Sequence, residues 1–590
     1  MADRCAAPGG RTPFSFGIDP KILAFVIVPL VAMTPLVTLF GIPLLWRAVG
    51  SMLGWYLRRK TDGRRSHLLE LMEEDEKKYQ KENEKKRRDS DDDEDEKEWE
   101  KLDVYTVGTS KNGDKADKDW DGIVGFFHPF CNAGGGGERV LWAAIRATQK
   151  RWPKAKCIVY TGDHDVTKDA ILARVENRFN IHLHPPTINF LYLSTRHWVL
   201  ASTWPHFTLA GQSIGSIIMA WDAFSLLVPD VFVDTMGYAF ALGLSKFFFR
   251  DVPTGAYVHY PTISTDMLDS LDPKSAVGGQ GVNAGKGAGT KGLVKKLYWQ
   301  LFAKIYSWMG SSADVVMTNS TWTQGHIRRL WGPLRNNSLL GGRKSNPIAV
   351  VYPPVAVREL EHEIEVSEAS ESLREKGLLL YIAQFRPEKN HQLILQSFAE
   401  FVKTGTEAAK TARLVLVGSV RDGADSKRVY KLRLLVDELH IRDRVEFHLD
   451  ASWPEILEWL RKASVGVNGM WNEHFGIGVV EYQAAGLISV VHDSGGPKLD
   501  IVVDVDGQPT GFHATTSTEF AQAFEKALSL PDTAAVRQRA RQSAKRFTEE
   551  EFAKKWTAQM EKLVHLRAQD PPFPVGLPLL RVSLLPGMFR

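Results

Sequence analysis

Short apolar runs separated by longer segments of helical periodicity recur along most of the chain. Ile123 to Phe127 is the first of these runs, and Leu378 to Ala383 opens a second series after the break at Pro353-Pro354. Apolar runs of this length are typical of strands buried on both faces. We expect further strands at 157–160, 190–193, 231–233, 256–259, 315–317, 348–352, 414–417, 445–447, 465–467 and 488–491. Strands that alternate with helices predict an α/β fold with parallel sheets.

The start of the chain has a different pattern. Ile22 to Trp46 is almost entirely apolar and uncharged, and its 25 residues exceed the roughly 20 that span a bilayer. It therefore predicts a transmembrane helix, although Pro29, Pro35 and Pro43 leave an interfacial or re-entrant segment as the alternative. More cations follow this run than precede it, so the positive-inside rule places the bulk of the chain in the cytosol.

Three other stretches bear on the membrane or on solvent. Residues 62–118 are dominated by charged side chains, which predicts a solvated helix or a disordered tether. Leu209 to Leu227 and Met236 to Phe249 are unusually apolar, and the second ends in aromatic residues between two cations. Such segments are either buried core helices or a membrane-facing surface, and the pattern leaves both open.

Composition bounds the remaining possibilities. The 590 residues, 44% of them hydrophobic, suffice for two domains. A net charge of +4 is too small to indicate nucleic acid, and Cys5, Cys131 and Cys157 follow no metal-ligand spacing. The organisation we expect is a lumenal N-terminus, an anchor, a charged tether, two Rossmann-like domains and a tail, at 1–20, 21–47, 48–118, 119–352, 353–567 and 568–590.

The densest candidate chemistry lies in the second domain. Glu473 and Glu481 flank a turn in which Gly476, Ile477 and Gly478 open a helix. Glycine lets the backbone approach a ligand closely, and the free N–H groups of a helix start bind anions. A diphosphate between two carboxylates that accept sugar hydroxyls is the arrangement that a nucleotide sugar requires. The alternative is that the two acids are a helix cap and a solvated helix residue.

Two cations and a second glycine loop are expected at the same cleft. Arg386 and Lys389 follow a buried strand, where they would neutralise a leaving diphosphate or merely cap a helix. In the first domain the loop with Gly135, Gly136 and Gly137 comes between a strand and a helix, although it matches no nucleotide-binding consensus. His259 comes at the carboxyl end of another strand, where parallel sheets bind ligands.

These motifs resemble those of a known enzyme family. The order E-x-F-G-x-x-x-x-E, then A-A-G, then S-G-G-P, from Glu473 to Pro497, resembles retaining glycosyltransferases with the GT-B fold of two Rossmann-like domains. The strings GFFHPFCNAGGGGERVLW, VHYPTISTDM and AQFRPEKNHQLIL are similar to the endoplasmic-reticulum α-1,2-mannosyltransferases of asparagine-linked glycosylation. The family lysine aligns with Lys389, whereas Gln384 occupies the usual arginine position, so Arg386 would substitute for that arginine.

The resemblance implies an activity and roles for the residues. It implies transfer of mannose from GDP-mannose, with retention and without a metal or other cofactor, to an oligosaccharide on dolichol diphosphate. Glu473 would hold the mannose, Glu481 the ribose, Lys389 and Arg386 the phosphates, and His259 the transferred sugar. It also implies the endoplasmic-reticulum membrane and, among partners, other mannosyltransferases of the pathway. The alternatives are another lipid-linked glycosyltransferase and a catalytically silent membrane scaffold.

Overall fold

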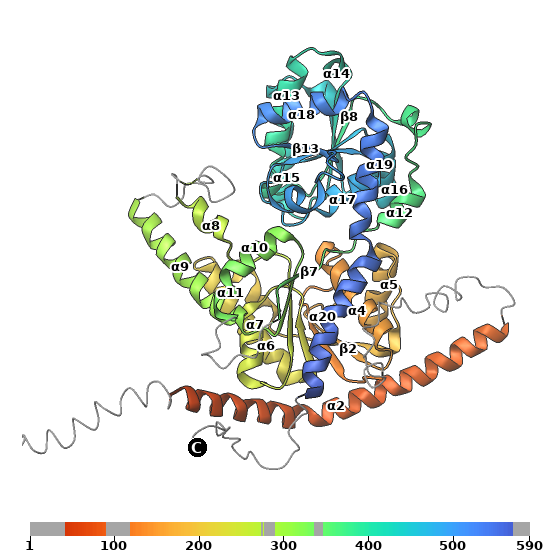
Figure 1. Ribbon diagram of the computed structural model, residues 1–590. Helices are drawn as coiled ribbons and strands as arrows, with labels where there is room; N and C mark the ends of the chain where they lie inside the picture. Colours follow the sequence, from red (N-terminus) through yellow and green to blue (C-terminus); the bar gives the residue numbers. More distant parts are fainter. Residues whose placement is uncertain (1–41, 90–118, 273–274, 276–288, 336–345, 570–590) are drawn as a thin grey trace, which may run out of the picture.

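The computed structural model describes residues 42–89, 119–272, 275, 289–335 and 346–569. Figure 1 shows two lobes, one built on each of two sheets. Most of the expected anchor, the first 20 residues, 90–118, and the tail from 570 lie outside the described residues. So does most of 276–292, a stretch rich in Gly, Ala and Lys whose composition predicts a flexible surface insertion. Within the described ranges, no helix combines the length and apolar character that crossing a bilayer requires.

The first lobe contains a seven-stranded parallel sheet in the order β3-β2-β1-β4-β5-β6-β7. Its central strands are buried on both faces, as the continuous apolar runs predict. The strands are β1 (Ile123–Phe127), β2 (Lys156–Thr161), β3 (Ile188–Tyr192), β4 (Val231–Asp234), β5 (Thr254–Val258), β6 (Val315–Thr318) and β7 (Ala349–Val350). The helices are α4 (Gly136–Arg151), α5 (Lys168–Phe179), α6 (Thr208–Leu226), α7 (Ala239–Phe248), α8 (Thr265–Ser270), α9 (Gly289–Ser311), α10 (Thr321–Leu330) and α11 (Gly332–Arg335).

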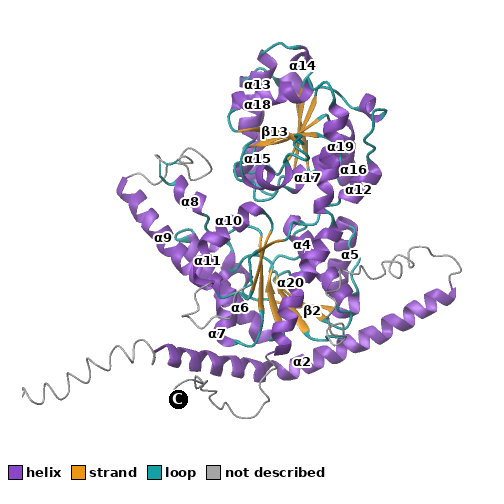
Figure 2. Cartoon of the chain, viewed as in Figure 1, coloured by secondary structure: helices purple, strands orange, loops and turns teal. Residues whose placement is uncertain are grey.

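The second lobe has a six-stranded parallel sheet in the order β10-β9-β8-β11-β12-β13. Figure 2 shows helices on both faces of each sheet. The strands are β8 (Leu378–Ile382), β9 (Arg413–Gly418), β10 (Val445–Leu449), β11 (Val465–Asn468), β12 (Ile488–His492) and β13 (Gly511–Ala514). The helices are α12 (Val357–Glu363), α13 (His391–Lys403), α14 (Glu407–Lys410), α15 (Gly423–Glu438), α16 (Trp453–Lys462), α17 (Ile477–Ala484), α18 (Ser517–Leu528) and α19 (Thr533–Ala544). The expected α/β fold with two parallel sheets is confirmed.

The last described helix, α20 (Glu549–Gln569), belongs by packing to the first lobe, although its sequence follows the second. Phe552, Trp556, Met560 and Leu563 are buried in the same core as Phe126 of β1. The apolar face of α20 finds its partner on α4 and the first sheet, so the chain crosses between the lobes a second time.

The N-terminal helix α2 (Ile42–Asp89) covers the first 42 residues of the expected charged tether. It is not a solvated helix along its whole length, because Leu57, Leu68 and Met72 are buried in the core of the first lobe. Gly50 and Gly54 allow close approach: a Cβ on either would lie 2.3 or 2.2 Å from the carbonyl oxygen of Phe247 or Phe248. The apolar segment from Met236 to Phe249 is thus covered by α2 and lies largely in the core of the first lobe.

Ion pairs complete the docking of α2. Arg58 pairs with Asp251 at 2.7 Å, and Arg65 pairs with Asp230 at 2.5 Å. Both carboxylates also pair with Arg567 at the end of α20. The cations after the expected anchor therefore hold the helix on the first lobe, which is a function additional to orienting it in a membrane.

We predict that Gly54→Ala loosens α2, because the new methyl group would overlap a backbone oxygen that has no rotamer with which to move away. Overpacking of this kind costs about 1 to 3 kcal/mol. The expected result is a lower Tm and faster proteolysis within α2. Gly63→Ala on the same helix is the matched control, since its Cβ would meet nothing within 4 Å and alanine should stabilise the helix by about 0.5 to 1 kcal/mol. Equal Tm values for the two variants would contradict the packing described here.

Candidate active site at the junction of the two lobes

The candidate residues of the second lobe occupy loops at the carboxyl ends of its central strands and the helix α17 that follows one of these loops. The loop after β11 leads through Glu473 to Gly476, which has a φ of 104° and precedes the first residue of α17. Glycine is needed there because other residues avoid this backbone conformation. Gly495 and Gly496 pass so close that a Cβ on them would lie 2.3 Å from the Glu473 oxygen and 2.6 Å from the Phe475 Cα atom. The glycines of the two motifs thus let two loops pack backbone to backbone.

Lys389 and Glu473 form an ion pair between two of these loops. Asn468 at the end of β11 also donates to the Glu473 carboxylate, at 3.5 Å. Burial opposes ionisation of Glu473, but the charge and hydrogen bond of Lys389, with contributions from His474 and Asn468, together hold the pKa of Glu473 below its ordinary value. The carboxylate is therefore ionised at neutral pH and able to accept hydrogen bonds from hydroxyl groups.

Glu481 lies in the second turn of α17, eight positions after Glu473. Burial raises the pKa of Glu481, the charge of Arg139 opposes this rise, and Glu359 adds to it. Because Arg139 lies on α4, this carboxyl group responds to a charge from the first lobe. Its surroundings differ from those of Glu473, and the two acids are suited to different tasks.

Arg386 does not join the ion pair of Lys389 and Glu473. Its guanidinium lies 3.7 Å from Glu388 in its own loop, and its buried Nε atom has no hydrogen-bond partner among the described residues. The substitution of Arg386 for the family arginine thus stays a prediction. The unpaired Nε is a donor available to an anionic ligand.

The first lobe contributes its glycine loop and His259. A Cβ on Gly136 would lie 2.6 Å from the Ile477 side chain, and one on Gly137 would lie 3.7 Å from the Nε2 atom of His259. Residues expected from the sequence as parts of one site thus meet across the junction of the lobes. Burial lowers the pKa of His259 to about 4, so its imidazole is neutral at pH 7, and its Nε2 atom has no partner among the described residues.

A second histidine and an acid lie beside this loop, and neither was expected from the sequence. His128 follows β1 as His259 follows β5, and its Nδ1 atom lies 2.7 Å from the Thr235 hydroxyl. Its Nε2 atom lies 3.7 Å from Glu138, which accepts the Gly135 N–H at 2.6 Å. Glu138 therefore shapes the glycine loop from within. The place of His128 directly after a strand was the signal that could have identified it.

Other contacts close the junction around Glu473. Asn472 donates to Asp266 of α8 at 2.7 Å, and the His474 ring stacks on Tyr260 with 4.0 Å between ring centroids. The residues before and after Glu473 are thus both held by the first lobe. Its position consequently depends on how the two lobes meet.

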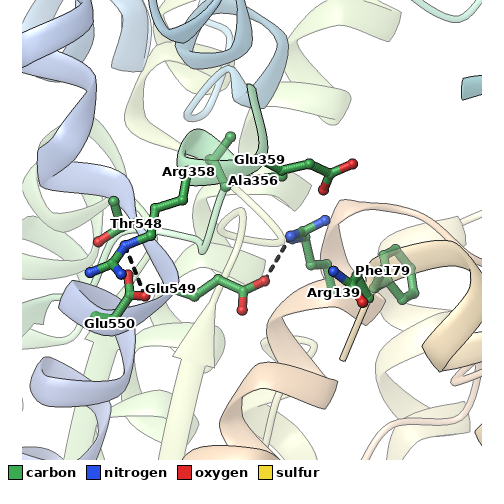
Figure 3. Close-up of a pocket in the computed structure, with 10 residues that line it drawn as sticks. Arg139, Phe179, Ala356, Arg358, Glu359, Thr548, Glu549 and Glu550 are labelled. Atoms are coloured by element: carbon green, nitrogen blue, oxygen red, sulfur yellow. Dashed lines mark hydrogen bonds and ion pairs between the residues drawn. The ribbon is translucent and has the colours of Figure 1, made fainter. Parts of the chain in front are cut away.

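A small cavity lies behind this junction, where α20 begins (Figure 3). Its volume is about 130 Å³, which is below the roughly 300 Å³ of ordinary ligand pockets. Arg139 pairs with Glu549 at 2.7 Å, and Arg358 pairs with Glu550 at 3.0 Å across it. The Arg358 bridge ties α12 of the second lobe to α20, whereas the Arg139 bridge joins α4 and α20 within the first lobe. Among the described residues, no group of three or more His, Cys, Asp and Glu side chains could hold a metal ion.

Comparison with known proteins gives two family matches. The description "ALG11 mannosyltransferase N-terminus" matches residues 121–331, and "Glycosyl transferases group 1" matches residues 363–547. The chain is 75% identical over 558 residues to the GDP-Man:Man(3)GlcNAc(2)-PP-Dol alpha-1,2-mannosyltransferase of Neurospora crassa, covering 93% of this chain and 99% of that protein. It is 43% identical over 465 residues to the Homo sapiens protein of the same name, covering 78% and 89%.

Solved structures share the fold at low identity. Sucrose-phosphate synthase from Thermosynechococcus elongatus aligns with a TM-score of 0.51 and 14% identity, covering 75% of this chain and 98% of that one. The Candida albicans trehalose-6-phosphate phosphatase N-terminal domain aligns with a TM-score of 0.54 and 13% identity, covering 77% and 98%. Identities this low show the two-sheet GT-B architecture alone.

We predict that acid weakens the contact made by His474. Burial lowers its pKa from 6.5 to about 4, with Glu473 opposing this shift and Lys389 and His326 adding to it. Between these pH values the unfolded chain binds the proton and the folded chain does not, so stability rises with pH across this window and is lost on acidification.

The variant His474→Phe keeps an aromatic ring on Tyr260 and removes the titration. Its Tm should fall less than that of the parent chain when the pH is lowered from 6.5 to 4. His565→Phe is the control, because His565 is an exposed residue on α20. An unchanged pH dependence in His474→Phe would show that this imidazole does not titrate as described.

Proposed function

The chain belongs to the family of GDP-Man:Man(3)GlcNAc(2)-PP-Dol alpha-1,2-mannosyltransferases, and we propose that it transfers mannose from GDP-mannose in α-1,2 linkage to an oligosaccharide on dolichol diphosphate. The observation that carries this proposal is the pairing of Lys389 with Glu473 beside the start of α17. The resemblance of the sequence to this family further implies that the mannoses added are the fourth and fifth of the N-glycan precursor.

The ion pair supports a specific division of labour. Glu473, kept anionic by Lys389, orients hydroxyl groups of the mannose, while Glu481 binds the ribose. Lys389 and Arg386, with the N–H groups at Ile477 and Gly478, stabilise the negative charge that grows on the diphosphate as the bond breaks. Gly135, Gly136 and Gly137 leave room for the donor beside His259, whose neutral imidazole contacts the transferred sugar.

We propose that the reaction retains the configuration at the mannose anomeric carbon. The bond from this carbon to the phosphate oxygen breaks, and a bond to the acceptor 2-hydroxyl oxygen forms on the same face. The hydroxyl proton passes to the departing phosphate, so no side chain takes it and no covalent sugar forms on the protein. The diphosphate charge is met by side chains and N–H groups, and the reaction requires no metal ion.

The activity is tested with purified protein, radiolabelled GDP-mannose and dolichol-linked acceptors of defined length. Transfer should occur with GDP-mannose, not with UDP-glucose, and should persist in EDTA. A transfer that uses UDP-glucose would favour another lipid-linked glycosyltransferase. Absence of any transfer would favour the silent scaffold, and loss in EDTA that Mn²⁺ restores would refute the metal-free site.

We predict that Lys389→Ala lowers kcat by about two to three orders of magnitude, because a preorganised charge at a leaving group contributes about 3 to 4 kcal/mol. Lys403→Ala, a change of the same kind at an exposed position of α13, should leave kcat unchanged. Near-normal turnover in Lys389→Ala would contradict the assigned role.

The two acids should respond differently to substitution. Glu481→Ala should mainly raise the KM for GDP-mannose, since it removes binding common to ground state and transition state. Glu473→Gln should lower turnover without trapping a mannosyl-enzyme in mass spectrometry. A covalent mannosyl adduct would overturn the proposed mechanism.

We further propose that the protein is a single-pass protein of the endoplasmic-reticulum membrane with both lobes in the cytosol, where other mannosyltransferases of the pathway would meet it. The apolar stretch from Ile22 to Trp46 and the cations after it support this orientation. Protease added to sealed microsomes should digest both lobes, and their protection would reverse the topology. Asn319-Ser320-Thr321 is a glycosylation sequon, but it is a poor reporter of topology because Asn319, directly after β6, is buried.

A further inference from the structure

Helix α9 is apolar on both of its faces. Trp299, Phe302 and Tyr306 on the inner face are buried in the core of the first lobe. The outer face carries a stripe of exposed apolar side chains at spacings of three and four residues. The exposed fraction is 65% for Leu293, 68% for Leu297, 57% for Leu301 and 59% for Trp308, and the exposed Ile305 lies between the last two. A helix that is hydrophobic all round needs a second apolar partner. We call these five side chains the α9 stripe.

Further exposed apolar residues continue from the α9 stripe over α6 to the start of α2. Exposed Phe207 packs against Tyr298 of α9 with 5.3 Å between ring centroids. It is followed at intervals of seven residues by exposed Ile214 and Trp221 on α6. Trp221 packs against Phe248, and the neighbouring Phe247 packs against the exposed Trp46 of α2. Ring contacts thus join α6 to α9 at one end and to the start of α2 at the other, and exposed apolar residues of α6 lie between them.

The charged residues of α9 and of the start of α2 are all cationic. Neither α9 nor the first 20 residues of α2 contains an Asp or a Glu, whereas both contain several Lys or Arg residues. Lys304 lies within the α9 stripe, and its long stem can carry the ammonium group to a more polar layer. Apolar side chains mixed with cations suit a bilayer surface with anionic headgroups.

We propose that the α9 stripe lies in the headgroup region of a membrane, so that the first lobe rests on the bilayer along α9, α6 and the start of α2. Two observations favour a bilayer over another protein: α9 and the start of α2 contain no acidic residue, and the uncharged apolar run ends at Trp46, which is part of this surface. The surface is also connected to the candidate site, because α8, which packs beside α9, carries the Asp266 that bonds to the residue before Glu473.

This placement deepens the proposed function, on which its catalytic part rests. A lipid-linked acceptor keeps its lipid in the bilayer while its sugar reaches the site. A lobe that rests on the membrane along α9 would hold the junction of the lobes next to the headgroups. The stripe therefore contributes to recognition of the lipid-linked acceptor and not to the chemistry.

The test uses the full chain in proteoliposomes of phosphatidylcholine with a minor fraction of phosphatidylserine. Single cysteines at Leu297 and Leu301 receive a polarity-sensitive fluorophore, with Cys5 replaced by Ser, since Cys131 and Cys157 are buried. Nitroxides on the lipid chains should quench both labels, and aqueous iodide should not. Leu373→Cys, at a 76% exposed position of the second lobe, is the matched control and should show the opposite pattern.

Each other pattern overturns the placement. Quenching of the stripe labels by iodide would show a face open to water. Quenching by neither agent would show a face covered by protein, either a second copy or the apolar segment before α2. Lipid quenching that also occurs at Leu373 would show nonspecific insertion of the labels.

An activity assay tests the membrane placement of the α9 stripe independently. The double variant Leu297→Glu and Leu301→Glu should lower kcat/KM for a bilayer-embedded acceptor by about tenfold, because charge is disfavoured in the apolar layer. Its kcat/KM for a water-soluble acceptor with a shortened lipid should equal that of the parent chain, and so should its Tm. Equal losses with both acceptors would refute the proposal. If the parent chain transfers mannose to neither acceptor, the proposed function fails, while the quenching still decides the placement of α9.

Discussion

The candidate site depends on keeping one carboxylate charged in a place poor in water. Burial of Glu473 favours its neutral form, and the ammonium of Lys389, together with His474 and Asn468, offsets that tendency. The two residues come from different loops, after β8 and β11, which are neighbouring strands of one parallel sheet. Their meeting therefore requires the strand order and the close loop packing that Gly495 and Gly496 permit. A donor diphosphate would enter this balance as a third charge, and Lys389 would then be shared between the carboxylate and the phosphate.

The position of Glu473 also couples chemistry to the arrangement of the lobes. Asn472 and His474 on either side of it are held by Asp266 and Tyr260 of the first lobe. Relative movement of the lobes would thus be transmitted to the Glu473 carboxylate by its own neighbours in the chain. The second crossing by α20 opposes such movement, because Trp556 is anchored in the first core while Glu550 pairs with Arg358 of the second lobe.

The sequence predicted the parts of the fold that depend on local pattern. Buried strands of continuous apolar residues were assigned within one or two residues of their ends for most of the two sheets, whereas β13 was missed, since Gly511 and His513 give it neither an apolar run nor an alternation. Helix α2 was expected to be solvated or disordered because its charged residues dominate the average. Its docking depends on Gly50, Gly54 and a few spaced apolar residues, whose partners on α7 are far away in the sequence.

The same distinction applies to the site. Glu473, Glu481 and Lys389 lie in recognisable strings, and the pairing of Glu473 with Lys389 follows from the strand order. Glu138 went unnoticed because an acid in the first turn of a helix is common, and only the structure shows it bonding to the glycine loop and facing His128. The α9 stripe was hidden for the opposite reason: apolar residues in a helix suggest a core, and sequence spacing alone does not show which face is left uncovered. Function in this chain thus lies at the boundaries between packed units, where a residue's role is set by partners from distant segments.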